Sequence, residues 1–205
     1  MNILMIDTAE GTRCLLAVGE KTYYDENCVN AGAETLMPMI DALLSRAGIS
    51  VKDIDLFGAS VGPGSFTGLR VGLTTVRTLC YALDKPCFAV NNLRLTSYNN
   101  KSDKVIALAD AGNRVCYVAR FDGENELTKT TCMTLDDALS FIAEHKDFAV
   151  STDIKLKDKI AGTAGVGEAE LLRAIKSHCN NTGNYRELQP LYVRKAQPER
   201  GAGDL

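Results

Sequence analysis

Histidine is scarce in this chain: among its 205 residues, only His145 and His178 are histidines. A conventional histidine metal site needs several such side chains close together, and two histidines late in the sequence do not supply one. We expect each of them to be a surface or helix-end residue. The sequence therefore predicts no metal bound by the chain alone.

Long apolar runs and clustered basic runs are missing too. No apolar run approaches the ~20 residues that span a bilayer, and the run at residues 3–6 ends at Asp7, unlike a secretory signal. We therefore expect no membrane contact. The formal net charge is −3, so direct binding to an RNA backbone, which needs a concentrated basic surface, is not expected. We interpret the small basic cluster of Arg194, Lys195 and Arg200 as a solvated C-terminal segment, in preference to a phosphate contact.

The seven cysteines show no C-x-x-C spacing, and their number is odd. Most of them lie within apolar strand or helix patterns, as small buried residues do. This usage is typical of a reducing compartment and argues against disulfides, a zinc site or a catalytic thiol. We therefore expect a cytoplasmic protein.

The composition is that of an ordinary globular protein, with 45% apolar and 24% charged residues. Strand-like and helix-like segments alternate along the chain, which predicts an α/β fold. The polar stretch 91–100, followed by mixed charge at 101–104, predicts a boundary between an N-terminal lobe (1–100) and a smaller C-terminal lobe (101–205). The second lobe would include a helix at 167–179, and we expect its tail to pack back on the first lobe.

A glycine-rich turn at residues 62–72, GPGSFTGLRVG, lies between a predicted strand and a predicted helix. Backbone N–H groups at such a helix start favour an anion, so an anion or nucleotide site is one interpretation. The Walker and dinucleotide patterns both fail here, and a purely structural turn is the favoured interpretation. The residues that would form the anion site are Asp7, Thr8, Gly62, Gly64 and Ser65.

Two predicted helices, at 32–47 and 68–83, carry broad apolar faces. The second helix also has an arc of short or β-branched residues and little exposed charge. A helix with two packable faces lies either inside a large domain or at an interface, and this chain is not large. We therefore predict a partner contact through Leu36, Met39, Ile40, Leu43, Gly68, Gly72, Thr75 and Leu79.

The chain resembles the TsaB (YeaZ-like) family in several segments that follow the family's order. These are the glycine-rich turn, MNILMIDTA at 1–9, GAETLMPMIDALL at 32–44, DAGNRVCYVARFD at 110–122 and LQPLYVRKAQPER at 188–200. The resemblance implies an α/β fold of the actin-like/Hsp70/sugar-kinase ATPase superfamily (ribonuclease H-like), with two lobes of which the second is degenerate.

The resemblance also implies a function in tRNA processing. It points to a non-catalytic dimerisation or scaffold subunit needed for threonylcarbamoyl transfer to N6 of the adenosine beside the tRNA anticodon. The implied partners are a TsaD-like catalytic subunit, a TsaE-like ATPase and a second copy of the chain, with tRNA reached only through the complex. ATP or ADP and Mg²⁺ would bind within the complex, and no residue of this chain is assigned a catalytic role.

Two other functions remain open at the level of sequence. A stand-alone ATP-dependent phosphotransferase or ATPase would use Asp7 and the glycine-rich turn, but a second phosphate loop and a metal carboxylate are not assembled. A glycoprotease-like peptidase would need metal ligands, or a base beside Ser65, and the sequence places neither. ATP binding with turnover by the isolated chain would distinguish the first of these from an interaction subunit.

Overall fold

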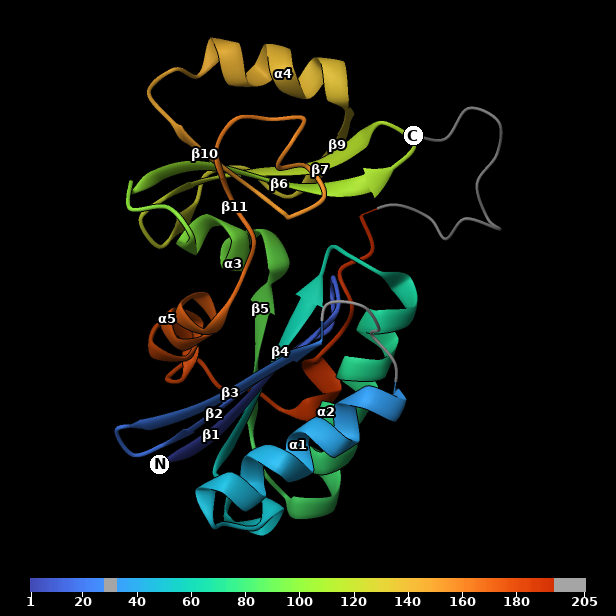
Figure 1. Cartoon of the computed structure of the whole chain (residues 1–205), viewed down its shortest axis with the longest axis vertical. Coiled ribbons are helices and arrows are strands. Elements are labelled where there is room, and N and C mark those ends of the chain that lie inside the picture. Colours follow the sequence, from blue (N-terminus) through green and yellow to red (C-terminus); the bar gives the residue numbers. More distant parts are fainter. Residues whose placement is uncertain (28–32, 194–205) are drawn as a thin grey trace. The chain divides into compact units, whose positions relative to one another are not determined.

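The computed structural model describes residues 1–27 and 33–193, and its contacts divide the chain into two compact units (Figure 1). Unit 1 comprises Met1–Asn91 and Gly167–Leu191, and unit 2 comprises Asn92–Val166 together with residues 192–193 of the described chain. The predicted C-terminal tail and its basic cluster lie outside the described residues.

A five-stranded sheet forms the centre of unit 1, in the order β3-β2-β1-β4-β5. The pairs β1–β2 and β2–β3 are antiparallel, and β1–β4 and β4–β5 are parallel. The bounds of these strands are β1 (Asn2–Asp7), β2 (Thr12–Val18), β3 (Lys21–Asn27), β4 (Leu56–Gly62) and β5 (Cys87–Asn91), and β4 is the strand predicted before the glycine-rich turn.

Helices cover both faces of this sheet (Figure 1). On one face lie α1 (Ala33–Ala47) and α2 (Phe66–Leu83), and on the other α5 (Glu168–His178); the short 3₁₀ helices are η1 (Val51–Asp53) and η2 (Tyr185–Glu187). The buried apolar side chains of α1, α2, β1, β2 and β4 form one core cluster. Burial of this apolar area is the main force that holds the helices on the sheet.

Helix α2 begins and ends at identifiable signals. The Ser65 hydroxyl accepts a hydrogen bond from the Gly68 N–H at 3.2 Å and so caps the start of the helix. At the other end Asp84 adopts the left-handed conformation, with φ 52°, and the Lys85 N–H donates to the Cys80 carbonyl at 3.0 Å. The chain then turns at Pro86 directly into β5.

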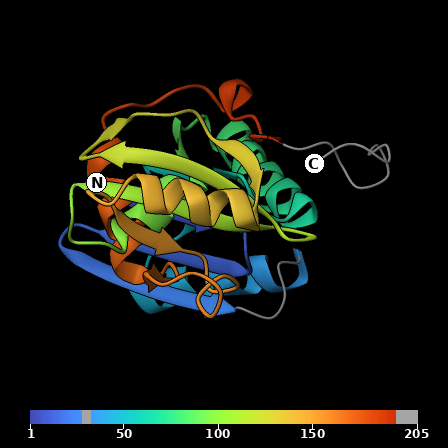
Figure 2. The same ribbon diagram turned by 90° about the horizontal axis from the view of Figure 1, so that it is seen from above.

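Unit 2 is built on a second sheet, in the order β11-β10-β6-β7-β8, with β9 paired to β7. Figure 2 shows α4 lying across these strands. The elements of unit 2 are α3 (Asn92–Tyr98), β6 (Lys104–Gly112), β7 (Val115–Asp122), β8 (Asn125–Glu126), β9 (Thr131–Thr134), α4 (Leu135–Glu144), β10 (Ala149–Thr152) and β11 (Thr163–Ala164).

The structure differs from the sequence interpretation around the lobe boundary. Residues 92–98, expected to be part of a polar boundary segment, form the buried helix α3 at the start of unit 2. The helix predicted at 167–179 exists as α5, but it belongs to unit 1 rather than to the second lobe. Hydrophobic periodicity shows that a helix has a buried face without showing which sheet that face meets.

Candidate functional site

The glycine-rich turn packs tightly against the residues that follow β1. The Ser65 N–H donates to the Ala9 carbonyl at 2.8 Å, and a Cβ on Gly64 would lie 2.7 Å from the same oxygen. Gly62 has a φ of +103°, which favours glycine at this position. The Ser65 N–H, which an anion would need, is thus already bonded, and this fits the structural interpretation of the turn. The anion site stays a prediction.

Asp7, the other component of that predicted site, lies in a buried ion pair. The antiparallel register of β1 and β2 places Asp7 opposite Arg13, and Arg13 Nη1 lies 2.9 Å from Asp7 Oδ2. The other carboxylate oxygen accepts hydrogen bonds from the Ser60 hydroxyl and, at 3.0 Å, from the Ala9 N–H. The side chains of the pair are only 0% and 4% exposed, so water does not screen it.

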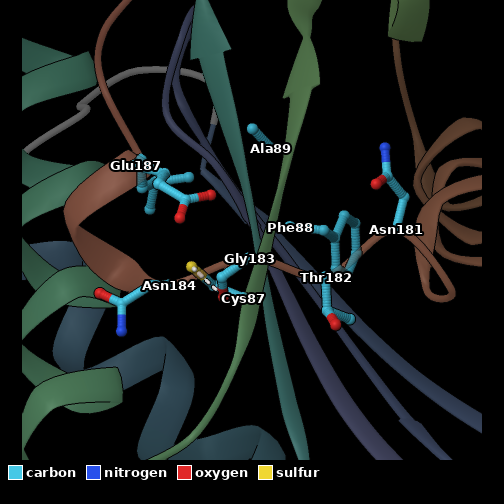
Figure 3. A pocket seen from close by; sticks show the side chains of 9 residues that line it. Cys87, Phe88, Ala89, Asn181, Thr182, Gly183, Asn184 and Glu187 are labelled. Carbon is cyan, nitrogen blue, oxygen red and sulfur yellow. Dashed lines mark hydrogen bonds between the residues drawn. The ribbon is translucent and has the colours of Figure 1, made fainter.

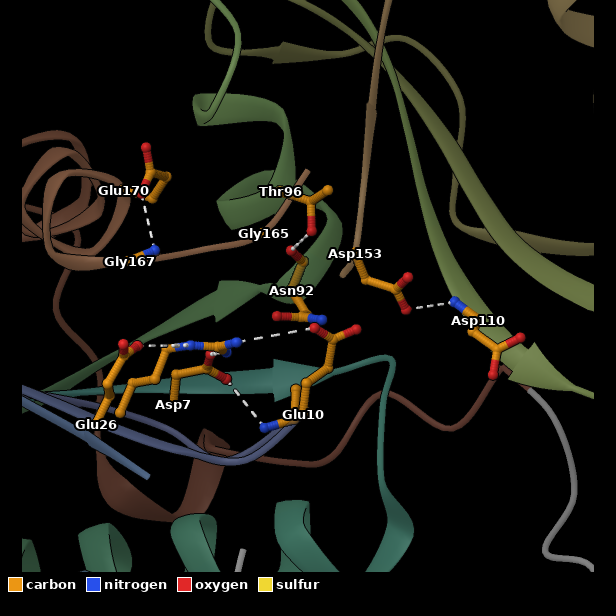
Figure 4. A network of polar contacts seen from close by, with 12 residues as sticks. Asp7, Glu10, Glu26, Asn92, Thr96, Asp110, Asp153, Gly165, Gly167 and Glu170 are labelled. Carbon is orange, nitrogen blue, oxygen red and sulfur yellow. Dashed lines mark hydrogen bonds and ion pairs between the residues drawn. The ribbon is translucent and has the colours of Figure 1, made fainter. Parts of the chain in front are cut away.

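Two further carboxylates approach the same guanidinium, as Figure 4 shows. Glu10 Oε2 lies 4.0 Å from Arg13 Nη2, and Glu26 Oε2 lies 3.9 Å from Arg13 Nε, too far for a hydrogen bond. Burial lowers the pKa of Arg13, but the carboxylates of Asp7 and Glu10 outweigh it and hold that pKa above its ordinary value. Arg13 therefore remains a cation at this position.

These residues do not fit a magnesium–nucleotide site. Mg²⁺ is held by the negative charge of carboxylate oxygens, whereas Asp7 is already neutralised by the buried Arg13 cation and also accepts hydrogen bonds from Ala9 and Ser60. Within residues 1–27 and 33–193, no group of three or more His, Cys, Asp or Glu side chains is arranged to hold a metal ion. We therefore derive no chemical step through a nucleotide or metal at Asp7.

Sequence reasoning missed Arg13, although a signal for it was present. Asp7 and Arg13 flank a short turn at equal distances from its centre, and directly opposed residues of a hairpin point their side chains to the same face. An acid and a base in such positions predict an ion pair. With Arg13 included, the sequence favours a neutralised Asp7 over one that faces a ligand.

The predicted interface on α1 is corrected by the structure. Four side chains assigned to a partner are at most 7% exposed and lie in the core cluster of unit 1, where α1 packs against β2 and β3: Leu36, Met39, Ile40 and Leu43. The sequence showed one broad apolar face on this helix, and that face meets its own sheet. The exposed large apolar residue of α1 is Met37, which is 42% exposed.

The predicted interface on α2 is corrected in part. Gly68 and Gly72 are buried, and a Cβ on Gly72 would collide with the side chain of Thr8. Gly72 is therefore required for the packing of α2 on the residues after β1. Thr75 and Leu79 are half-buried: Leu79 packs on the core cluster, whereas Thr75 lines a shallow hollow on the outer side.

The exposed side of α2 carries aromatic and basic side chains on one arc. At 100° per residue the arc spans about 120°. We call it the α2 outer face, and it consists of Phe66, Arg70, Thr74, Arg77, Thr78 and Tyr81. Tyr81 is 71% exposed and Phe66 37%, and the Arg70 guanidinium lies 3.9 Å from the centroid of the Phe66 ring. Two hollows run along this face, and Tyr185 of η2 joins the wall of one of them.

The remaining sequence predictions concern histidines, cysteines and membrane contact. His145 and His178 lie at the C-terminal ends of α4 and α5, as expected. Of the cysteines that the structure describes, four are buried and two are partly exposed; Cys28 lies outside the described residues. In the described part of the chain, no helix is both long and apolar enough to cross a membrane.

Comparison with protein families gives a match over most of the chain. A family model described as "TsaD: tRNA N6-adenosine threonylcarbamoyltransferase" matches residues 26–183. A tRNA N6-adenosine threonylcarbamoyltransferase of Novosphingobium aromaticivorans is 36% identical over 56% of this chain, which corresponds to 34% of that protein. The chain thus spans about a third of that relative's length.

A second relative matches from end to end. The tRNA threonylcarbamoyladenosine biosynthesis protein TsaB of Bacillus subtilis is 28% identical, over 97% of this chain and 96% of its own length. Among solved structures, YeaZ from Pseudomonas aeruginosa superposes with a TM-score of 0.76 at 20% identity, covering 93% of this chain and 99% of YeaZ. This likeness confirms the predicted two-lobed α/β fold.

Proposed function

The chain belongs to the TsaD (tRNA N6-adenosine threonylcarbamoyltransferase) family and, within it, to the TsaB (YeaZ-like) proteins, and on this premise we propose that it is a non-catalytic interaction subunit. In this proposal it supports threonylcarbamoyl transfer to adenosine N6 of tRNA. A TsaD-like subunit carries the chemistry and a TsaE-like ATPase acts on the complex. The chain works in the cytoplasm and meets tRNA only through the complex.

The observation that carries the proposal is the α2 outer face. Tyrosine, phenylalanine and arginine are the residues that protein interfaces favour. Here they share the exposed arc of α2, and the opposite side of α2 packs in the core cluster. The face belongs to a rigid helix, since Ser65 caps the start of α2 and the buried side of α2 packs on β4. We propose that the TsaD-like subunit binds there, and that a second copy of the chain occupies the same face in its absence.

The neutralised Asp7 supports this function over a stand-alone ATPase. A phosphotransferase of the actin-like superfamily needs a carboxylate that is free to hold a metal–phosphate complex. Arg13 would have to leave a buried ion pair before Asp7 could do so, at a cost of several kcal/mol, about 3–5. We therefore place any nucleotide within the assembled complex and not in this chain alone. Calorimetry with ATP and Mg²⁺ tests this point, and tight binding with turnover by the purified chain would contradict it.

Two substitutions on the α2 outer face, a charge reversal and an aromatic truncation, test the binding surface. We expect Arg70→Glu and Tyr81→Ala to weaken binding to the TsaD-like subunit at least about tenfold, or about 1.4 kcal/mol. The matched control is Lys176→Glu, an exposed charge reversal on α5 of the same unit. Circular dichroism would establish that all three variants fold.

Two results would reject the proposal. One is unchanged binding by both variants of the α2 outer face; the other is equal weakening by Lys176→Glu. The role in tRNA modification has its own test, in which the TsaD-like and TsaE-like proteins and the supply of carbamoyl-adenylate are combined with tRNA. Modified adenosine should appear only when the chain is added.

A further inference from the structure

One of the two hollows along the α2 outer face has a wall made of hydrogen-bond donors. Its volume is about 320 Å³, and it is lined by Thr74, Arg77, Thr78 and Tyr81 of α2 and by Tyr185 of η2. Each of these side chains carries an N–H or O–H group, and a guanidinium carries five N–H donors in one planar fork. The hollow therefore offers one cation and four hydroxyls to a group that enters it.

The two tyrosines hold the wall of this hollow in place. The Tyr81 and Tyr185 rings meet edge to face, with centroids 5.6 Å apart and an interplanar angle of 67°. Tyr185 also packs against the core cluster of unit 1, and the Arg186 guanidinium lies 5.6 Å from the centroid of its ring. Because these side chains are already ordered, a ligand that binds here orders few further groups, and less side-chain entropy is lost on binding.

The positive charge of this hollow is not balanced by carboxylates of its own wall. In the described part of the chain no ion pair includes Arg77, and α2 contains no Asp or Glu. Two acidic residues of neighbouring segments line other hollows. Asp84 lines the one on the far side of Tyr185, and Glu187 lines the one that Figure 3 shows. The hollow is thus complementary to a carboxylate that comes from another molecule.

We propose that the TsaD-like subunit places the carboxylate of an Asp or Glu side chain in this hollow, where it pairs with Arg77. The inference rests on the proposed function, because it specifies the chemistry of the partner that binds the α2 outer face. A carboxylate accepts two parallel hydrogen bonds from a guanidinium, and such charge-assisted bonds are roughly twice as strong as neutral ones. The hydroxyls of the wall donate to the lone pairs that remain.

A second copy of the chain is less complementary to the same hollow. The two ends of the α2 outer face carry the rings of Phe66 and Tyr81, and between them Arg70 and Arg77 lie on either side of Thr74. A two-fold axis that sets α2 antiparallel to its copy would therefore bring arginine against arginine. Since α2 has no carboxylate to place between them, the like charges weaken this contact. Arg77 thus favours the TsaD-like subunit over self-association.

One substitution tests both halves of this proposal, with opposite expected signs. Arg77→Glu should weaken binding to the TsaD-like subunit at least about tenfold in calorimetry, because it sets one carboxylate against another. The same variant should strengthen self-association about tenfold in sedimentation equilibrium at low salt, because it replaces a like-charge contact with Arg70 of the second copy by an attractive one. A variant that fails to fold would weaken both associations, so misfolding cannot produce this result.

Salt dependence separates the effect of charge from that of shape. Binding of the wild-type chain to the TsaD-like subunit should weaken between about 50 and about 500 mM NaCl, because salt screens the pair as it forms. Arg77→Gln should lower the affinity at low salt at least about tenfold and reduce this dependence on salt. Lys176→Gln, which removes the same charge from an exposed position on α5, is the matched control and should change neither.

The outcomes distinguish this inference from the proposed function. If Tyr81→Ala weakens binding while Arg77→Gln changes neither the affinity nor its salt dependence, the α2 outer face is the binding surface but no carboxylate pairs with Arg77. If no variant of the α2 outer face changes binding, both proposals are wrong. The inference is also overturned if Arg77→Glu shifts both associations in the same direction, or if no acidic residue of the TsaD-like subunit couples to Arg77 in double-mutant cycles.

Discussion

At the scale of single residues, the buried ion pair of Asp7 and Arg13 limits the possible functions of unit 1 most strongly. A buried ion pair contributes little net stability, since desolvation cancels much of its Coulomb attraction. Its two halves nevertheless depend on each other, because either charge alone would be buried without a partner. The pair thus fixes the turn after β1 in a form that holds Asp7 away from ligands.

Removing Arg13 should be costly for that reason. We expect Arg13→Met to lower the free energy of unfolding by about 3–5 kcal/mol, as measured by urea denaturation, since it leaves the carboxylate of Asp7 unpaired. The double variant Arg13→Met, Asp7→Asn removes both charges and should recover a large part of that loss. A single-variant loss below about 1 kcal/mol, the range of exposed pairs, would show that the pair is hydrated.

The space at position 72 should not accommodate even the methyl group of alanine. In an exposed helix position alanine is more favourable than glycine by up to about 1 kcal/mol. At Gly72 the added Cβ would meet the Thr8 side chain, so we expect Gly72→Ala to destabilise by about 1–3 kcal/mol in thermal or urea unfolding. Thr74→Ala, on the exposed side of the same helix, is the control and should change stability by less than about 0.5 kcal/mol. A stabilising Gly72→Ala would mean that the contact with Thr8 can relax.

At the scale of elements, local patterns predicted most helices and strands but not their partners. The ends of α2 carry local signals, a cap at Ser65 and a break at Pro86, and such signals act within a few residues. The apolar face of α1 was equally visible, yet periodicity does not distinguish a face on its own sheet from a face on a partner. The buried positions of α1 were therefore assigned to an interface, and the exposed α2 outer face was not.

Helix α3 was missed because its environment, not its sequence pattern, stabilises it. Every residue of α3 is buried, including Arg94, so it lacks the polar side that marks an amphipathic helix. The Arg94 guanidinium donates to the carbonyls of Gly123 and Glu124 at 2.7 and 2.9 Å and lies 4.0 Å from the centroid of the Phe121 ring. These partners are about thirty residues away in sequence, out of reach of any local rule.

The short helix η1 provides a pH-dependent prediction. The Asp53 carboxylate accepts hydrogen bonds from the Ser50 N–H and hydroxyl, both at 2.8 Å, and these lower the pKa of Asp53. A lowered pKa in the folded state means that the stabilising contribution is full above the unfolded value, about 3.9, and is lost as pH falls through the folded value. NMR titration should find the Asp53 pKa below its ordinary value, and Ser50→Ala should raise it in part. A pKa at or above the ordinary value would refute the capping contacts.

At the scale of the whole molecule, unit 1 is assembled from two distant parts of the sequence. The segment Gly167–Leu191 supplies α5 to one face of the first sheet, a backbone bridge from Gly183 to Cys87, and Leu188 to the core cluster. The two-lobed α/β class could be predicted, because it needs only the order of elements. The return of the chain to unit 1 could not, because it depends on contacts between α5 and strands about 150 residues earlier in the chain.

This assembly should appear in native-state hydrogen exchange. Leu171 and Ile175 of α5 are buried within unit 1, so Ile175→Ala should destabilise that unit by about 2–4 kcal/mol and speed amide exchange in β1 and β2. Exchange in β6 and β7 of unit 2 should change much less. Leu156→Ala is the matched control, since Leu156 lies in the unit 2 core and should give the opposite pattern. If Ile175→Ala speeds exchange mainly in β6 and β7, then α5 belongs to the second lobe, as the sequence alone suggested.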